Sequence, residues 1–304
     1  MTLKDKATES LRRVTRFTPA RWWRNAAIER TAWTVLVWLL FGLFVLGPLA
    51  TVVLFSFTRS VFQGVTPNTL EWYVALFTKP ELYGPLIRSF EIALIVAVIQ
   101  LFLGTLIAYA TVRNRIWGAK TLDAMSNITI ALPSVVVGLA LLAFYGAFGP
   151  AHLLTDLIFG NPLTLTFTIW IVVLAHVLET FPYMVRAVGA VLQKMDPNLE
   201  GAARSLGASK FYVFRTITLP QLRPGLVAGS VLVLSRSIAE FGATIIVVAA
   251  ALRTAPIKIY SEAEAGSLEI AAAYSVVLML VSFTAYLAMS RWLIKGWERE
   301  HLQE

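Results

Sequence analysis

Six long apolar runs constrain the fold of this chain more than any other feature of its sequence. A run of about 20 apolar residues, wound as an α-helix, can cross a hydrocarbon layer about 30 Å thick. Because lipid offers no hydrogen bonds to backbone amides, continuous runs of this length form helices rather than the alternating strands of a barrel. The sequence therefore predicts an all-α, polytopic membrane protein with six transmembrane helices, at residues 34–55, 92–111, 128–148, 163–183, 226–252 and 270–290.

The composition supports a membrane environment, and the charges predict an orientation. Hydrophobic residues make up 57% of the chain, whereas soluble domains are about 45 to 50% apolar. Of the 26 Lys and Arg residues, 20 lie in the N-terminal tail, the second and fourth loops and the C-terminal tail; five lie on the opposite side, and one lies within a span. By the positive-inside rule we expect both termini in the cytoplasm, as an even number of spans requires.

The expected organisation has three parts. Residues 1–33 form a basic segment, residues 34–295 a transmembrane domain with a long cytoplasmic loop at 185–224, and residues 296–304 a cytoplasmic tail. The basic segment can form a helix on an anionic leaflet or a tail that only sets orientation. The first apolar run is too long for a signal-peptide core, so we expect it to be retained. The chain has no cysteine, which excludes disulfides and thiolate metal sites.

A short helix is predicted in the first half of the long loop. Asp196 is a good N-cap, and Pro197 follows it at the first helical position. Gly207 suits the left-handed position that ends a helix, because glycine adopts positive φ without a steric penalty. The sequence therefore predicts a helix that starts at Pro197 and a bend at Gly207.

A second short helix is predicted after this bend. Ser209 can cap a helix over residues 210–218, and Pro220 is expected to end it. Such a helix–bend–helix unit can simply tie two spans together, and DNA-binding helix-turn-helix motifs have the same outline. Because a motif that binds duplex DNA needs a packed third helix, we do not expect nucleic-acid binding.

The loop also contains a spaced pattern: Gly-Ala-Ala, three residues, Gly, nine residues, Ile, one residue, Leu-Pro. This pattern resembles the signature loop of type I ABC importer permeases, in which Glu is usual where this chain has the first Gly. The residues concerned, with the neighbouring acidic residue, are Glu200, Gly201, Ala202, Ala203, Gly207, Ile217, Leu219 and Pro220. The resemblance implies that the first short helix docks on a cytoplasmic ATPase and that the loop transmits closure of the ATPase to the spans.

The same resemblance implies the partners of the chain. They are a cytoplasmic ABC ATPase dimer, a second permease subunit that is another copy or a paralogue, an extracytoplasmic substrate-binding protein and membrane lipid. The expected location is the cytoplasmic membrane of a bacterium or archaeon. ATP and Mg belong to the ATPase, because this chain has no Gly-x4-Gly-Lys-Ser/Thr phosphate loop. We therefore expect a transport subunit that binds no cofactor and is not an enzyme.

The resemblance covers residues 88–293. Within them, three further stretches indicate a particular group of permeases. Residues 131–138, which contain Leu-Pro-Ser-Val-Val-Val-Gly, and residues 237–244 and 254–260 are similar to the permeases for molybdate, tungstate and sulfate. The resemblance implies an oxyanion as the solute. Permeases for thiamine, ferric iron, polyamines and phosphonates share much of this pattern and remain alternatives.

Two charged residues are predicted to lie inside the fifth span. Arg236 lies ten residues into this run, about 15 Å deep at 1.5 Å per residue. Glu240 follows one turn later on the same face, so the two can form an ion pair. The pair is either a structural salt bridge or part of the lining or gate of a pathway between two subunits. Phe241, Pro133 and Ser134 are further candidates for that pathway.

Two other polar pairs lie in or near the spans. His176 and Glu179 are one turn apart on the fourth span, and Arg88 and Glu91 lie at the outer end of the second. A lone histidine in a span more often links helices by hydrogen bonds than it serves a solute. We regard both pairs as lesser candidates for the pathway.

Two other classes of function remain as distant alternatives. A membrane-embedded enzyme would need catalytic residues, but the sequence has no His-Glu-x-x-His motif. Its nearest match to a Gly-x-Ser-x-Gly elbow, residues 203–207, belongs to the signature loop. An ion-coupled carrier would have no need of that loop, and we find no internal repeat of the kind that builds such carriers.

Overall fold

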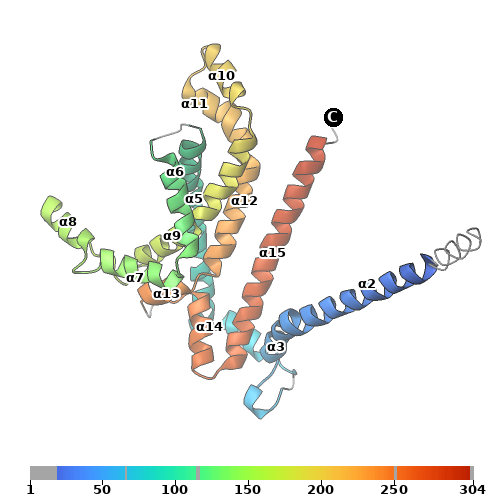
Figure 1. Cartoon of the computed structure of the whole chain (residues 1–304). Coiled ribbons are helices and arrows are strands. Elements are labelled where there is room, and N and C mark those ends of the chain that lie inside the picture. The colour runs from blue at the N-terminus through green and yellow to red at the C-terminus, as the bar shows by residue number, and fades with distance from the viewer. Residues whose placement is uncertain (1–18, 66, 114–116, 250–251, 302–304) are drawn as a thin grey trace, which may run out of the picture. The chain divides into compact units, whose positions relative to one another are not determined.

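The structure is a computed structural model that describes residues 19–65, 67–113, 117–249 and 252–301. Within these residues every regular element is a helix, apart from one isolated β-bridge between Thr58 and Pro67. The predicted all-α class is therefore confirmed (Figure 1). The chain divides into two units, residues 1–54 and residues 55–304. Residues 1–18 of the predicted basic segment and residues 302–304 of the predicted tail lie outside the described residues.

The described part of the first unit is one long helix, whose apolar part begins near Glu29. α2 (Pro19–Phe41) continues through a π-helical turn, η1 (Gly42–Leu46), into α3 (Gly47–Ser56). The π-turn precedes Pro48, whose ring would clash with the preceding turn of an unbroken α-helix. From Trp33 onward, large apolar side chains point to all sides of this helix, which is the pattern of a membrane-spanning helix.

The second unit contains the other membrane-crossing segments. Four of them are long and apolar enough: α5 (Pro80–Val112), α7 (Ser134–Tyr145) with α8 (Pro150–Phe159), α9 (Ile169–Lys194), and Lys210–Ile238, which includes α12 (Leu219–Ile238). The last helix, α15 (Leu268–His301), has a shorter apolar part at Leu268–Thr284. Together with the first unit, these segments correspond in order to the six predicted spans.

The third predicted span is not continuous. α6 (Ala119–Ala131) ends before Leu132 and Pro133, and α7 begins at Ser134. Leu132 is extended (φ −77°, ψ 138°), because a residue that precedes proline disfavours the α region. The prediction of an unbroken helix over 128–148 is therefore wrong, and the proline is the reason.

The fifth predicted span is also broken. α12 ends at Ile238, and α13 (Gly242–Val247) begins after Glu240 and Phe241. The Glu240 carboxylate accepts a hydrogen bond from the backbone N–H of Ala243 (2.9 Å), one of the N–H groups that a helix start leaves without a helical partner. Hydropathy did not reveal this break, because an apolar run indicates that a segment lies in lipid but not whether its helix is continuous.

The predicted second loop helix does not end at Pro220. α11 (Lys210–Val213) passes through a π-helical turn, η3 (Phe214–Thr218), directly into α12, whose first turn contains Pro220. That part of the loop prediction is wrong. The wide π-turn before the proline accommodates its ring, so the chain stays helical.

The main core lies where α5, α9 and α12 pack side by side (Figure 1). Small residues allow a close approach: a Cβ on Gly225 would lie 2.9 Å from the carbonyl oxygen of Ala187, and one on Gly229 would lie 2.5 Å from the Met184 sulfur. In lipid, apolar burial gives helices no net reason to associate, so close packing of this kind holds them together.

A second, smaller core attaches the last helix. It contains Leu76 of α4 (Glu71–Thr78), Leu82 of α5, Ala255 of α14 (Ala255–Glu264) and Tyr274 of α15. The Tyr274 hydroxyl donates a hydrogen bond to the Leu82 carbonyl. The buried tyrosine therefore connects α15 to the start of α5.

Candidate functional site

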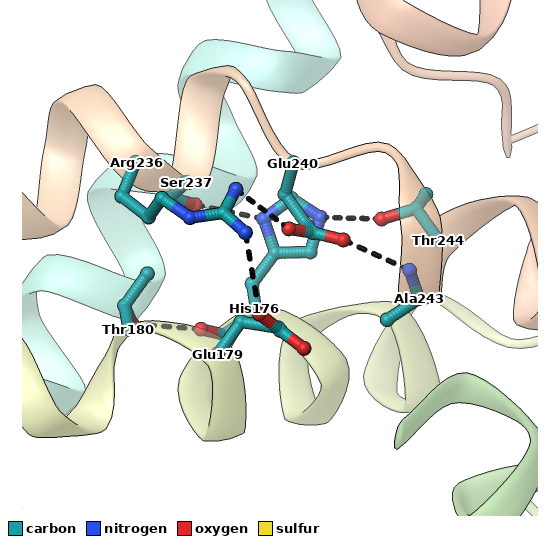
Figure 2. Close-up of polar contacts among 8 residues, drawn as sticks. All are labelled: His176, Glu179, Thr180, Arg236, Ser237, Glu240, Ala243 and Thr244. Atoms are coloured by element: carbon teal, nitrogen blue, oxygen red, sulfur yellow. Dashed lines mark hydrogen bonds and ion pairs between the residues drawn. The ribbon is translucent and has the colours of Figure 1, made fainter. Parts of the chain in front are cut away.

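Arg236 and Glu240 meet at the break between α12 and α13. The Arg236 Nη1 atom lies 2.8 Å from Glu240 Oε2, so the ion pair expected from their spacing is present. Glu240 Oε1 accepts the N–H of Ala243, as Figure 2 shows. The carboxylate therefore bridges the end of α12 and the first turn of α13. Its side chain is 1% exposed, whereas that of Arg236 is 31% exposed.

Glu179 of α9 supplies a second carboxylate to the same arginine. Its Oε2 lies 3.3 Å from Arg236 Nη2, and its side chain is 5% exposed. The Oε1 atom has no hydrogen-bond partner among the described residues. We refer to Glu179, Arg236 and Glu240 as the ion cluster; with both carboxylates ionised, it carries one net negative charge. Sequence spacing paired Glu179 only with His176, and an acidic residue inside an apolar run was the one signal of its importance.

His176 links α9 to both sides of the break. Its Nδ1 is hydrogen-bonded to the Ser237 hydroxyl (2.8 Å) and its Nε2 to the Thr244 hydroxyl (2.9 Å). The imidazole is fully buried. Figure 2 shows it directly beside the ion cluster. Helix-to-helix hydrogen bonding, the role expected for this histidine, is therefore what its contacts provide.

The two broken helices meet at small residues. A Cβ on Gly242, the first residue of α13, would lie 2.7 Å from the Ser134 Cβ at the start of α7. One turn later, a Cβ on Gly138 would lie 2.5 Å from the carbonyl oxygen of Ala243. The structure therefore brings the candidate Ser134 to the break that carries the ion cluster. Pro133, the residue before it, is exposed at the kink.

The remaining sequence candidates have other contacts. Phe241 is half-buried against α14, with its ring centroid 5.3 Å from that of Tyr260. Arg88 donates a hydrogen bond to the Arg253 carbonyl (3.1 Å). Within the part of the chain that the structure describes, it forms no ion pair with Glu91.

The helix–bend–helix loop has the local structure that its sequence predicts. Asp196 caps α10 (Pro197–Ser205) by accepting the N–H of Asn198 (2.9 Å), and Ser209 caps α11 by accepting the N–H of Tyr212 (3.2 Å). Gly207, between the two helices, has φ +89°. The two caps and the left-handed bend are confirmed, and they present α10 and α11 at one end of the second unit (Figure 1).

The residues of the signature pattern differ in exposure. Ala202, Gly207, Leu219 and Pro220 are exposed, and Gly201, Ala203 and Ile217 are half-buried. Glu200, in contrast, is 4% exposed. Its Oε1 accepts a hydrogen bond from the Thr218 hydroxyl (2.9 Å). Glu200 therefore points into the fold, which its position in the sequence did not indicate.

The long apolar helices define a multi-pass membrane protein, and its similarity to known families gives its class. The family described as binding-protein-dependent transport system inner membrane component matches residues 100–296. The chain belongs to this family and is the permease subunit of an ABC importer.

Individual relatives agree with this assignment. The molybdenum transport system permease protein ModB of Escherichia coli is 36% identical over 224 residues, which cover 72% of this chain and 96% of the relative. ModB of Haemophilus influenzae is 34% identical over 225 residues, with 70% and 96% covered. In a crystal structure of a bacterial ABC transporter involved in the import of the acidic polysaccharide alginate, one chain superposes with a TM-score of 0.67 at 17% identity. The match covers 89% of this chain and 99% of that one and shows the shared fold.

Proposed function

We propose that this chain and a second permease subunit, another copy or a paralogue, form the translocation pathway of an importer for an oxyanion such as molybdate, tungstate or sulfate. One observation carries the oxyanion assignment: the chain matches 96% of the length of two relatives that are named molybdenum permeases. The similarity of residues 131–138, 237–244 and 254–260 to oxyanion permeases supports the same class. An extracytoplasmic binding protein would deliver the solute.

The exposed loop is the proposed docking surface for a cytoplasmic ABC ATPase dimer, which would hold ATP and Mg. Leu206 is 90% exposed, Phe211 72% and Tyr212 60%. Large apolar side chains gathered on a polar loop indicate a surface that a partner covers. The excess of Lys and Arg on this side supports a cytoplasmic position for the loop and for both termini, in a bacterial or archaeal membrane.

The ion cluster is the proposed lining or gate of the pathway. Charges buried at membrane depth commonly face a charged partner or an aqueous path. Arg236 pairs with two carboxylates, and its side chain is also 31% exposed. Transport sites in membrane proteins also tend to form where helices are broken. Pro133 lies in one of the two breaks, Ser134 is the first helical residue after it, and Phe241 lies in the other break; these positions support their place beside the cluster.

Reconstitution tests this proposal. The permease and its ATPase are placed in liposomes, and the cognate binding protein is added outside with radiolabelled molybdate. Uptake should require ATP inside and the binding protein outside, and tungstate or sulfate should compete. Uptake driven by an ion gradient without ATP would contradict the importer mechanism. Competition by thiamine, ferric iron, a polyamine or a phosphonate, but not by tungstate or sulfate, would overturn the oxyanion assignment.

A further inference from the structure

Glu200 is held inside the docking loop by two contacts. Its Oε1 accepts the hydrogen bond from the Thr218 hydroxyl (2.9 Å) and lies 3.6 Å from Arg113 Nε. Leu199, the residue before it, is 48% exposed, whereas Glu200 is 4% exposed. A carboxylate removed from water is costly unless it is paired and hydrogen-bonded. Thr218 supplies the hydrogen bond, and Arg113 supplies the opposite charge.

The register of α10 explains why this glutamate points inward. Successive residues of an α-helix are about 100° apart around its axis, so a glutamate at 200 and one at 201 would face different directions. Position 201, where related permeases usually have the glutamate, is open: no heavy atom lies within 4 Å of a Cβ built on Gly201. A glutamate at 201 would therefore face outward, whereas Glu200 faces the helices of its own chain.

Arg113 joins three helix ends at this point. It directly follows α5, and its Nη2 donates a hydrogen bond to the carbonyl oxygen of Met195 (3.0 Å), the residue that directly follows α9. Its Nε faces Glu200 of α10, and its side chain is 11% exposed. A cation is favoured at helix C-termini, where the backbone carbonyls carry partial negative charge. Arg113 therefore connects the ends of α5 and α9 to the docking helix.

We propose that Glu200 and Arg113 form an internal lock that makes the end of α5 follow α10 when the ATPase closes. This inference rests on the proposed docking of α10 on the ATPase. Along the backbone, α10 is connected to α9 and α11 only, so a displacement of α10 reaches α5 through side chains. Glu200 and Arg113 are thus positioning residues, which act on the spans without contacting the ATPase or the solute.

Glu200→Gln tests the lock, because it keeps the size of the side chain and an acceptor for Thr218 but removes the charge that attracts Arg113. We expect the stimulation of ATP hydrolysis by the loaded binding protein, measured in liposomes, to fall about tenfold, within the range usual for linked sites. Retention of the ATPase in a detergent pull-down should not change. Arg113→Gln should give the same result, and the double variant should lose no more than either single one.

Two further variants serve as controls. Arg113→Lys keeps the positive charge and should retain most of the stimulation; a loss as large as that of Arg113→Gln would overturn the ionic lock. Lys194→Gln removes an exposed charge at the end of α9 and should leave the stimulation unchanged.

The outcomes separate this inference from the docking proposal. If Glu200→Gln loses the ATPase from the pull-down, Glu200 contacts the ATPase directly, and the lock is wrong while the docking stands. Wild-type stimulation in folded Glu200→Gln would also overturn the lock. Failure of the docking proposal itself would appear as wild-type ATPase retention in a variant that distorts the bend at Gly207.

Discussion

Replacement of Arg236 by glutamine measures what the ion cluster contributes to the fold. In Arg236→Gln, the carboxylates of Glu179 and Glu240, 5% and 1% exposed, lose the cation that pairs with both. Removal of one partner from a buried ion pair costs about 3 to 5 kcal/mol, a large part of the roughly 5 to 15 kcal/mol that stabilises a folded protein. We therefore expect Arg236→Gln to unfold at a markedly lower temperature in detergent.

Compensating substitutions should recover the fold only if they remove every unpaired charge. Arg236→Gln with Glu240→Gln still leaves the buried Glu179 carboxyl without its cation, so this double variant should remain destabilised. The triple variant, which adds Glu179→Gln, keeps the volumes of the two buried glutamate side chains, shortens only the partly exposed Arg236 and contains no buried charge at the site. Because neutral replacements of buried ion pairs are often close to neutral for stability, the triple variant should recover most of the folded protein.

Transport by the triple variant then decides the role of the cluster. Folded protein is measured by thermal unfolding in detergent, and uptake is measured in liposomes with the ATPase and binding protein. We expect a folded triple variant whose uptake stays well below that of the wild type, because the proposed pathway role of the cluster depends on its charges. Wild-type uptake in the triple variant would refute this reasoning and leave the cluster a role in packing alone.

The remaining predictions concern the loop, the topology and a helix contact. Gly207 and Gly266 both have positive φ (+89° and +82°), which a β-branched residue adopts only with strain. Gly207→Val should therefore lose the ATPase in a detergent pull-down, whereas Gly266→Val, outside the loop, should retain it; equal retention would mean that the loop is only a tether. Since the chain has no native cysteine, a cysteine at Glu264 should react with an impermeant thiol reagent in intact cells and one at Lys194 should not; labelling at Lys194 would contradict the six-span topology. Finally, Gly138→Ala would place a Cβ 2.5 Å from the Ala243 carbonyl oxygen and should destabilise the fold by about 1 to 3 kcal/mol; an unchanged unfolding temperature would show that α7 and α13 separate easily.

Structure that depends on neighbouring residues was predictable from the sequence alone. The positions of the spans follow from hydropathy, because the thickness of the hydrocarbon layer sets the length of each apolar run. The caps at Asp196 and Ser209 were predictable because a capping side chain bonds to backbone N–H groups two or three residues later. The positive φ of Gly207 follows from the same local logic.

One break in the spans had a sequence signal, and the other had none. Pro133 disfavours a helical conformation at Leu132, so the break between α6 and α7 could have been predicted from the residues. The break after α12 depends on Glu240, whose carboxylate accepts the N–H of Ala243 and pairs with Arg236. In the sequence, Glu240 stands four residues after Arg236, which is the spacing of an ion pair on a continuous helix. The spacing therefore gave no sign that the helix breaks at this glutamate.

Only the tertiary structure decided which distant side chains meet. Glu179 lies 57 residues from Arg236 in the sequence, and Glu200 of the helix–bend–helix loop pairs with Arg113, which directly follows α5. Ion pairing depends on separation in space and on burial, and a local pattern encodes neither. Membrane helices that are apolar on every side also lack the polar face that would show which side packs against a neighbour. The sequence therefore determined the spans and the local geometry of the loop, whereas helix packing determined the ion cluster and the inward direction of Glu200.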